Sequence, residues 1–295
     1  MTLLKRVKVP IIMYHDVVPE AEIARLPGER IHYAIGLEKF REQMQFLKKR
    51  GKIGIHFSRF YRLLQEDPGE LFSGKYVILT FDDGHDSQVK FAVPVLQEMG
   101  FTATFFTVAD WIGTVGFVSE NDLKNLIAAG MDVQSHTASH LFLIELNSHQ
   151  SVRELLGSKK KLEAIIGKPV EFLSLPGGRS DHSVWQLCGA YGYRGILTSL
   201  MGYGNFQPFW EKIHSNGYVP HGYYRIPVGR GMSPDTFENL ILMKGWQPAF
   251  YWWRNRLANL IKRVIGNEMY HTIWMRLFRG KRRQPVRQEA SAKHA

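Results

Sequence analysis

Residues 76–87 read YVILTFDDGHDS, and this stretch carries the strongest indication of both fold and chemistry in the chain. An apolar, β-rich run that ends at Phe81 passes directly into Asp82 and Asp83. Two adjacent carboxylates raise one another's pKa when both are charged. A divalent cation bound to one of them removes that cost and leaves the other free to accept a proton. A polar turn, with an Asp that caps the next helix, is the alternative interpretation.

A second polar motif follows a later apolar run. Residues 131–140 read MDVQSHTASH and place His136 and His140 four residues apart. On a helical turn this spacing points both imidazoles the same way, as metal binding requires, although the spacing alone is weak support. Strand carboxyl ends are where barrel active sites assemble. Asp83, His136 and His140 would then give three protein ligands with room for water.

A third motif, VEFLSLPGGRSD at residues 170–181, takes another predicted strand into a Pro-Gly-Gly turn. Glycines let backbone N–H groups approach a ligand closely, which suits an oxyanion site. Pro176 and Gly177 are therefore candidate substrate-contacting residues. Taken alone, this segment is better interpreted as a plain tight turn.

The end of the first predicted strand carries three polar residues, Tyr14, His15 and Asp16. These residues could line the same pocket as the second and third motifs. A polar cluster at a strand end, without a role in binding, is an equally good interpretation. We keep Tyr14 and His15 as candidates for substrate contact.

Short apolar runs alternate with helical patterns through most of the chain. The runs predict strands at Val9–Tyr14, Tyr76–Phe81, Thr102–Val108, Met131–Ser135, Val170–Leu175, Tyr193–Thr198 and Tyr223–Val228. Helices are predicted at Leu37–Arg50, Ser87–Met99, Ser119–Ala129, Gln150–Ile166 and Ser180–Tyr191, and Ser119 with Asp122 has the form of a capping signal. This alternation favours a parallel α/β fold, and seven strands suit a barrel-like closure better than an open sheet.

Charge divides the chain into a near-neutral body and a basic end. From residue 246 onward there are eight Arg and three Lys against two Glu, a net charge of +9, so the first 245 residues carry +2 of the total +11. Apolar residues in 246–282 recur at helical spacing, and such a basic amphipathic helix can lie on an anionic membrane. Simple packing on the body is the alternative, and basic residues alone do not predict a nucleic-acid partner. We expect three parts: a body at 1–245, a helical extension at 246–282 and a disordered tail at 283–295.

Composition excludes several classes of protein. The chain is 44% hydrophobic and 22% charged, which are ordinary globular values. Its single cysteine, Cys188, excludes an intramolecular disulfide framework and any multi-cysteine metal site. We predict no signal peptide and no transmembrane helix, because the first apolar run is short and no uninterrupted run of about 18 apolar residues occurs. A cytoplasmic location follows, with peripheral contact at the inner membrane face if the extension binds lipid.

Together, the three motifs resemble the polysaccharide deacetylase family, whose catalytic domain is related to the nodulation chitooligosaccharide deacetylase. TFDDG at 80–84 matches the first family motif, HTASH at 136–140 matches H-[S/T]-x-x-H, and SLPGG at 174–178 takes the place of R-x-P-x-G. MYHDV at 13–17, the stretch at 37–51 and YRIPVGRGMSPDTF at 224–237 also look like members from exopolysaccharide gene clusters. The resemblance covers roughly residues 8–240.

The resemblance implies a distorted, seven-stranded (β/α) barrel of the TIM-like type and hydrolysis of an acetyl group from a sugar with the help of a metal. Asp83, His136 and His140 would hold the divalent metal, with zinc as the first choice. Asp82 would be the general base, and the metal would lower the pKa of water towards about 7. The backbone N–H of Gly177 would face the developing oxyanion.

Three departures from the family pattern concern the proton-transfer residues. Ser174 stands where the family has an Arg that supports the catalytic Asp, and Arg179 is the nearest substitute. LTSLMGYG at 197–204 replaces the expected Asp/Trp motif. The late Leu-x-His motif, which supplies the general acid, is missing at RIPVG, which leaves three candidate acids: His182, His214 and His221. Without a separate acid, Asp82 would have to serve as both base and acid.

The leading hypothesis is a metal-dependent deacetylase of exopolysaccharide biosynthesis. Its substrate would be an N-acetylated sugar in a polysaccharide or in the lipid-linked precursor of one. A catalytically weak or inactive glycan-binding or scaffold protein on the same fold is the second hypothesis. An amidohydrolase of a small non-sugar amide is the third.

Overall fold

The computed structural model describes residues 9–28, 30–71, 73–206, 220–246, 250 and 253. The chain divides into two compact units, Met1–Pro248 and Ala249–Ala295, and most of the second unit lies outside the described residues. The predicted extension and tail at 246–295 therefore remain predictions. In the described part of the chain, no helix is long and apolar enough to cross a membrane.

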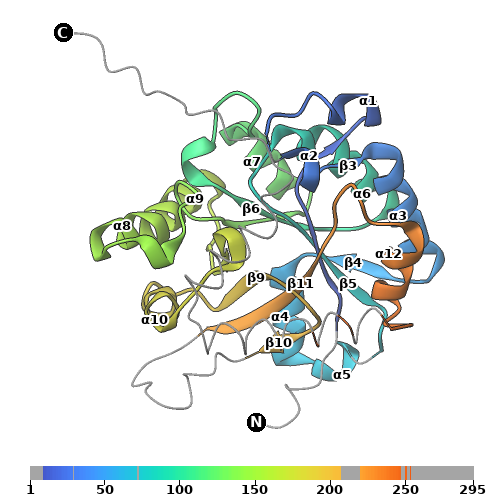
Figure 1. Cartoon of the computed structure of the whole chain (residues 1–295). Helices are drawn as coiled ribbons and strands as arrows, with labels where there is room; N and C mark the ends of the chain where they lie inside the picture. The colour runs from blue at the N-terminus through green and yellow to red at the C-terminus, as the bar shows by residue number, and fades with distance from the viewer. Residues whose placement is uncertain are drawn as a thin grey trace. The chain divides into compact units, whose positions relative to one another are not determined.

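Seven parallel strands close into a barrel, as the alternation of strands and helices predicts (Figure 1). Around the barrel the order is β1-β11-β9-β8-β7-β6-β5, and β5 pairs again with β1 through Ile11 with Ile78 and Tyr14 with Phe81. The barrel strands are β1 (Ile11–Tyr14), β5 (Tyr76–Phe81), β6 (Thr104–Thr107), β7 (Asp132–Ser135), β8 (Phe172–Ser174), β9 (Gly195–Met201) and β11 (His221–Pro227).

In the part of the chain that the structure describes, four short strands lie outside the closed ring, and none of them was predicted. They are β2 (Val17–Val18), β3 (Ile35–Gly36), β4 (Ile53–Ile55) and β10 (Asn205–Phe206). Strand β4 pairs with the first half of β5 and β1 pairs with its second half, overlapping at Ile78, so two strands share one edge of β5. This shared edge distorts the barrel.

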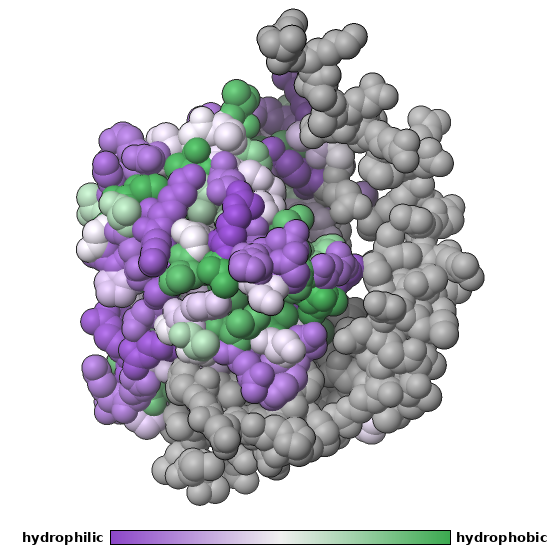
Figure 2. All heavy atoms as spheres, turned by 90° about the vertical axis from the view of Figure 1, so that its left-hand side faces the viewer, coloured by the Kyte–Doolittle hydropathy of each residue, from purple (hydrophilic) through white to green (hydrophobic). Residues whose placement is uncertain are grey.

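The helices mostly follow the strands, as expected for βα units. They are α1 (Glu20–Ile23), α2 (Arg30–Tyr33), α3 (Leu37–Lys49), α4 (Phe57–Glu66), α5 (Pro68–Leu71), α6 (Val93–Met99), α7 (Glu120–Ala128), α8 (Ser148–Val152), α9 (Ser158–Ile166), α10 (His182–Ala190) and α12 (Pro234–Ile241). Among the described residues, the π-helical turns η2 (Gln88–Ala92) and η5 (Arg153–Gly157) precede α6 and α9, and the 3₁₀ turns are η3 (Ala109–Trp111), η4 (Leu143–Glu145) and η6 (Pro176–Gly178). The face that carries α8, α9 and α10 is largely hydrophilic, with hydrophobic residues gathered in its middle (Figure 2).

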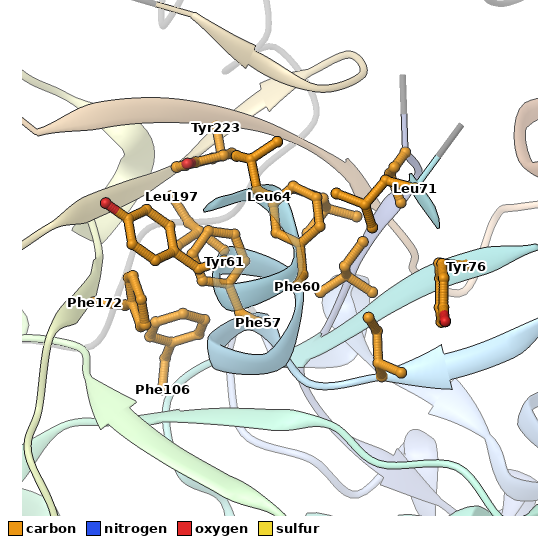
Figure 3. Packing of buried hydrophobic residues seen from close by; sticks show 14 residues of the cluster. Phe57, Phe60, Tyr61, Leu64, Leu71, Tyr76, Phe106, Phe172, Leu197 and Tyr223 are labelled. Carbon is orange, nitrogen blue, oxygen red and sulfur yellow. The ribbon is translucent and has the colours of Figure 1, made fainter. Parts of the chain in front are cut away.

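Helix α4 closes the amino-terminal end of the barrel with aromatic side chains. The Phe57 N–H donates to Thr104 Oγ1 at the start of β6, at 2.8 Å. The Phe57 ring then packs edge-on against Phe172 of β8 and Tyr223 of β11, with centroids 4.8 Å apart in both pairs (Figure 3). These aromatic side chains fill the amino-terminal end of the barrel, so we expect the polar site at the carboxyl ends of the strands.

Interior side chains change character along the barrel axis. Because alternate residues of a strand face the same side, Ile78, Thr80 and Asp82 form one interior column at β5. Tyr223 and Arg225 form another at β11, and all five are buried. The interior is therefore aromatic and aliphatic at one end and charged at the other.

Candidate active site

The three predicted metal ligands lie together at the carboxyl ends of β5 and β7. Asp83 Oδ1 is 3.3 Å from His136 Nε2 and 3.6 Å from His140 Nε2. One ligand atom from each residue lies within 4.8 Å of the others. Ligand atoms that share a tetrahedral ion at about 2.1 Å are about 3.4 Å apart, so this donor set fits a divalent metal.

The orientation of His136 also fits a ligand role. Its Nδ1 lies 2.8 Å from the carbonyl oxygen of Ser174, and because a carbonyl can only accept, Nδ1 carries the hydrogen. Nε2, which lies 3.3 Å from Asp83 Oδ1, is then the nitrogen that can bind a metal once its proton has left. A ring nitrogen fixed in this way is the usual support of a metal-binding imidazole.

The two imidazoles meet through a loop and not through a helical turn, so that detail of the sequence interpretation was wrong. Residues 136–140 are neither helix nor strand. Thr137 and His140 have φ angles of 67° and 63°, and Asp83 has 76°, all in the left-handed region. Such conformations cost on the order of 1–3 kcal/mol for residues other than glycine and are typical of functional sites.

Asp82 lies beside the three candidate ligands and is held by a buried arginine that sequence analysis missed. Arg225 Nη1 and Nη2 donate to Asp82 Oδ1 and Oδ2, each at 2.7 Å. The guanidinium also donates to the Thr198 carbonyl, to Thr80 Oγ1 and to Ser174 Oγ. All five of its N–H donors therefore meet an acceptor.

Arg225, and not Arg179, supports Asp82, so the expectation for Arg179 was wrong. Arg179 pairs instead with Glu145 at 3.0 Å, and its guanidinium lies 4.0 Å from the centre of the Phe142 ring. Ser174, at the position of the family's arginine, donates its hydroxyl to Asp82 Oδ2 at 2.9 Å. The supporting cation thus comes from β11, and a serine on β8 completes the contact.

Charges around the site shift the pKa values of its groups. Burial raises the pKa of Asp82, but the Arg225 charge and then His136 outweigh burial and hold that pKa below its ordinary value. The pKa of Asp83 is likewise held well below its ordinary value, because hydrogen bonds from His136 and His85 outweigh burial. Both carboxylates are therefore charged at neutral pH.

The pKa values of His136 and His140 are shifted in opposite directions. Burial and the neighbouring His136 lower the pKa of His140 to about 4. Burial lowers the pKa of His136 as well, but the Asp82 and Asp83 carboxylates outweigh it and leave that pKa raised. A metal must displace the proton of His136, so binding should weaken at acidic pH.

His15 is the fourth histidine of this cluster and is partly buried. Burial lowers its pKa, while the charges of Asp83 and Asp82 act in the opposite direction. Its ring lies 4.9 Å from the ring of Tyr33. The Gln88 amide, on the π-helical turn η2, donates to the carbonyl oxygens of both His15 and Asp82 and so ties the ends of β1 and β5 together.

Tyr14 does not join the site, which corrects its assignment as a substrate contact. It is fully buried, its ring packs against Phe40 and Phe81, and its hydroxyl donates to Gln43 Oε1 at 2.7 Å. Burial raises the pKa of the Tyr14 hydroxyl well above its ordinary value. We no longer expect Tyr14 to touch a substrate.

Pro176 and Gly177 form the turn η6 directly after β8. Gly177 has a φ of 61°, and a Cβ at this position would lie 2.6 Å from Phe142 Cε1. A residue with a Cβ would be strained in this conformation and would displace the Phe142 ring, so glycine suits this position. The oxyanion role of this turn remains a prediction.

The three candidate general acids differ in where they lie. His221 begins β11 and pairs with Gly195 at the start of β9, which is the amino-terminal end of the barrel. His182 begins α10. His214 lies outside the described residues.

Fold and geometry define a parallel (β/α) barrel with a carboxylate and imidazole site at the carboxyl ends of its strands. Residues 70–196 match the family model of the polysaccharide deacetylases. This part of the chain is therefore a polysaccharide deacetylase domain by its match to the family model.

Known relatives agree with this assignment. YxkH of Bacillus subtilis, whose name places it among the polysaccharide deacetylases, is 27% identical over 233 residues, which are 79% of this chain and 76% of that protein. A peptidoglycan-N-acetylglucosamine deacetylase of Bacillus cereus is 25% identical over 126 residues, 42% of this chain and 57% of that protein. A solved polysaccharide deacetylase from Bacillus cereus has a TM-score of 0.64 and 27% identity over 79% of this chain and 69% of its own.

Proposed function

We propose that this protein is a metal-dependent hydrolase that removes acetyl groups from N-acetylated sugars of a polysaccharide. The observation that carries the proposal is the juxtaposition of two kinds of group at one strand edge. Asp83, His136 and His140 offer a donor set for a divalent metal, with zinc as the first choice. Asp82, held by Arg225, lies 4.0 Å from His136 as a separate carboxylate that is free to accept a proton.

Asp82 would act as the general base. Its Oδ2 accepts hydrogen bonds from both Ser174 and Arg225, so Oδ1 has the more open lone pair for the proton of an attacking water. A bound metal would polarise the acetyl carbonyl and acidify water. The Gly177 N–H, on the turn η6, would face the oxyanion that develops on the acetyl carbonyl.

We assign the proton donor to His15 in place of His182, His214 or His221. His15 is the imidazole of this cluster that is left when His136 and His140 serve as ligands and His85 donates to Asp83. Its Nδ1 is buried and makes no hydrogen bond to another described residue. Because burial lowers the pKa of His15, its imidazole would first take up the proton that Asp82 removes from water, and would then give it to the leaving amine as the carbonyl carbon–nitrogen bond breaks and acetate is released.

The finer features of the substrate are part of the same proposal. A relative that bears the name of a peptidoglycan-N-acetylglucosamine deacetylase supports an N-acetylated amino sugar. A lipid-linked precursor is the second form in which such a sugar could reach the site. Contact of residues 246–282 with an anionic membrane would favour that form and is a further expectation.

Acetate release from oligomers of N-acetylglucosamine by the zinc-loaded protein tests the proposal. Asp82→Asn removes the base and is expected to lower kcat by about 10²–10⁴-fold, while bound zinc stays near the wild-type level. Asp86→Asn is the matched control, because Asp86 is on the same loop but pairs with Lys90 at the surface. Its activity should equal that of the wild type.

The outcomes separate the three hypotheses. Acetate release that persists in Asp82→Asn contradicts the role of Asp82. Zinc-loaded wild type that binds the oligomers but releases no acetate points to a glycan-binding protein. Release of acetate from small acetanilides, with none from the oligomers, points to an amidohydrolase of non-sugar amides.

A further inference from the structure

We propose that Glu154 is a positioning residue for the metal site, because it holds the loop between His136 and His140 in the conformation that aims both imidazoles at Asp83. This inference rests on the metal-dependent function proposed above. Glu154 lies on the π-helical turn η5, and its side chain is 1% exposed. It touches none of the three ligands and acts through the backbone between two of them.

The Glu154 carboxylate accepts three hydrogen bonds from this loop. Oε2 accepts from the N–H of Ala138 at 3.0 Å and from the N–H of Ser139 at 2.8 Å. Oε1 accepts from the Ser139 hydroxyl at 2.6 Å. Hydrogen bonds to a charged acceptor are about twice as strong as neutral ones, so one side chain fixes two successive peptide groups.

The other backbone N–H groups of the loop donate to acceptors other than Glu154. The N–H of His136 donates to the Thr107 carbonyl, that of Thr137 to Ser135 Oγ, and that of His140 to Thr137 Oγ1. Ala138 and Ser139 are the two positions between the histidines whose N–H groups depend on Glu154. A buried N–H without an acceptor is costly, so the loop would rearrange without this carboxylate.

The opposite edge of the loop is tied to the 3₁₀ turn η3, which follows β6. The carbonyls of Thr137 and Ala138 accept from the N–H groups of Ala109 and Asp110 at 3.1 and 2.8 Å. Arg153 joins the two sides, because its Nη2 lies 2.5 Å from Asp110 Oδ2 and its Nη1 lies 3.6 Å from Glu154 Oε1. The loop is therefore clamped between η3 and η5.

This clamp matters because the loop's backbone is unusual. Thr137 is β-branched and His140 is a bulky residue, yet both have φ in the left-handed region. Such residues keep this conformation only where surrounding contacts over-determine it. Glu154 supplies the contacts at the two residues between them.

Zinc affinity of the purified full-length chain, measured by competition with a chromophoric chelator, tests the proposal. Glu154→Met keeps the length of the side chain but removes both acceptors, and we expect zinc affinity to fall about 10–100-fold, as for other supports of metal ligands. Glu154→Gln keeps a carbonyl that can accept from both N–H groups, and its amide can donate to Ser139 Oγ. Its affinity should lie nearer the wild type than that of Glu154→Met.

Glu163→Met is the matched control. Glu163 lies on α9 and its carboxylate accepts from the Val170 N–H at 2.9 Å, so it fixes a loop that is remote from the ligands. We expect lower thermal stability with unchanged zinc affinity. The visible spectrum of the cobalt-loaded protein gives a second measurement, because altered ligand geometry in Glu154→Met should change its absorption bands.

Equal zinc affinity and cobalt spectra in wild type and Glu154→Met would overturn the proposal. If Glu154→Met does not fold, Ser139→Ala decides, because it removes one of the three hydrogen bonds: weaker zinc binding supports the role of Glu154, and unchanged binding overturns it. A wild type that binds neither metal would instead contradict the metal-dependent function itself.

Discussion

Asp82 and Arg225 form an ion pair that is almost wholly withdrawn from water. The Arg225 side chain is 0% exposed and that of Asp82 is 3% exposed. Burial of two ions costs several kcal/mol each, and the two 2.7 Å hydrogen bonds and their neighbours offset that cost. Removal of one partner from such a pair typically destabilises a protein by about 3–5 kcal/mol.

The pH dependence of the proposed reaction should therefore respond to Arg225. In Arg225→Met the effect of burial on the pKa of Asp82 is no longer opposed by the arginine, so that pKa rises. Because the base must be unprotonated, the acid limb of kcat/KM against pH should move to higher pH. Arg225→Lys keeps the charge but loses the bidentate contact, and a loss of about 10²-fold in kcat is expected from misplacement of Asp82.

Arg179→Met provides the control for these measurements. Arg179 pairs with Glu145 and does not contact Asp82, so the acid limb should stay in place. An acid limb that moves in Arg179→Met, or that stays unchanged in Arg225→Met, would contradict the assignment. The lowered pKa of Asp82 also affects the free energy of unfolding. The charged carboxylate stabilises the folded protein above the unfolded pKa of about 3.9, and this stabilisation is lost as the pH falls through the lower pKa of the folded state.

The sequence predicted which residues lie together as candidate ligands, but it did not predict the arginine that supports Asp82. Asp83, His136 and His140 could be found because carboxylate and imidazole motifs followed recognisable strands. Arg225 lies 143 positions from Asp82, and no local spacing connects the two. The sequence did contain one signal. Arg225 is two residues from Tyr223 on the same predicted strand, so both side chains face the same side, and a cation that faces the barrel interior needs a buried carboxylate as partner.

At the scale of elements, helix α7 begins where the predicted capping signal places its start. Ser119 Oγ accepts from the Asp122 N–H at 3.1 Å, and the Asp122 carboxylate accepts from the Ser119 N–H at 2.8 Å. This capping box confirms the predicted signal. It lies in residues that take no part in the proposed chemistry.

Ser119→Ala should lower the free energy of unfolding by about 1 kcal/mol, because a side-chain acceptor of the first helical turn is lost. Urea denaturation measures this change. Ser119→Asp, which restores an acceptor, should recover most of the stability. Equal free energies of unfolding in Ser119→Ala and wild type would show that the capping hydrogen bond does not stabilise the protein. A loss of zinc binding in Ser119→Ala would show that α7 is coupled to the site.

Elements were predicted best where a long apolar or amphipathic pattern was complete. Strand β5 has the predicted bounds, and α3 ends one residue before the predicted end. Strand β4 is only three residues long and its pattern was too short to detect. The turns η2 and η5 interrupt two predicted helices, and no propensity distinguishes a π turn from the α-helix around it.

At the scale of the whole molecule, closure of the barrel brings the distant motifs together. Strand β1 pairs with both β5 and β11, so the first and last barrel strands are neighbours. This closure places His15, Asp82 and Arg225 around one end of the barrel, although they lie far apart in sequence. Seven alternating strands predicted such a closure, whereas the shared edge of β5 depends on β4 and could not be predicted.

The metal content of the purified protein tests the central claim most directly, because it needs no knowledge of the substrate. Wild type and His136→Ala would be loaded with zinc, desalted and measured by atomic emission, with the exposed His149→Ala as control. The account predicts about one ion per chain in wild type and His149→Ala and a near-complete loss in His136→Ala. No bound metal in the wild type after loading with zinc or cobalt, or equal metal in His136→Ala, would contradict it.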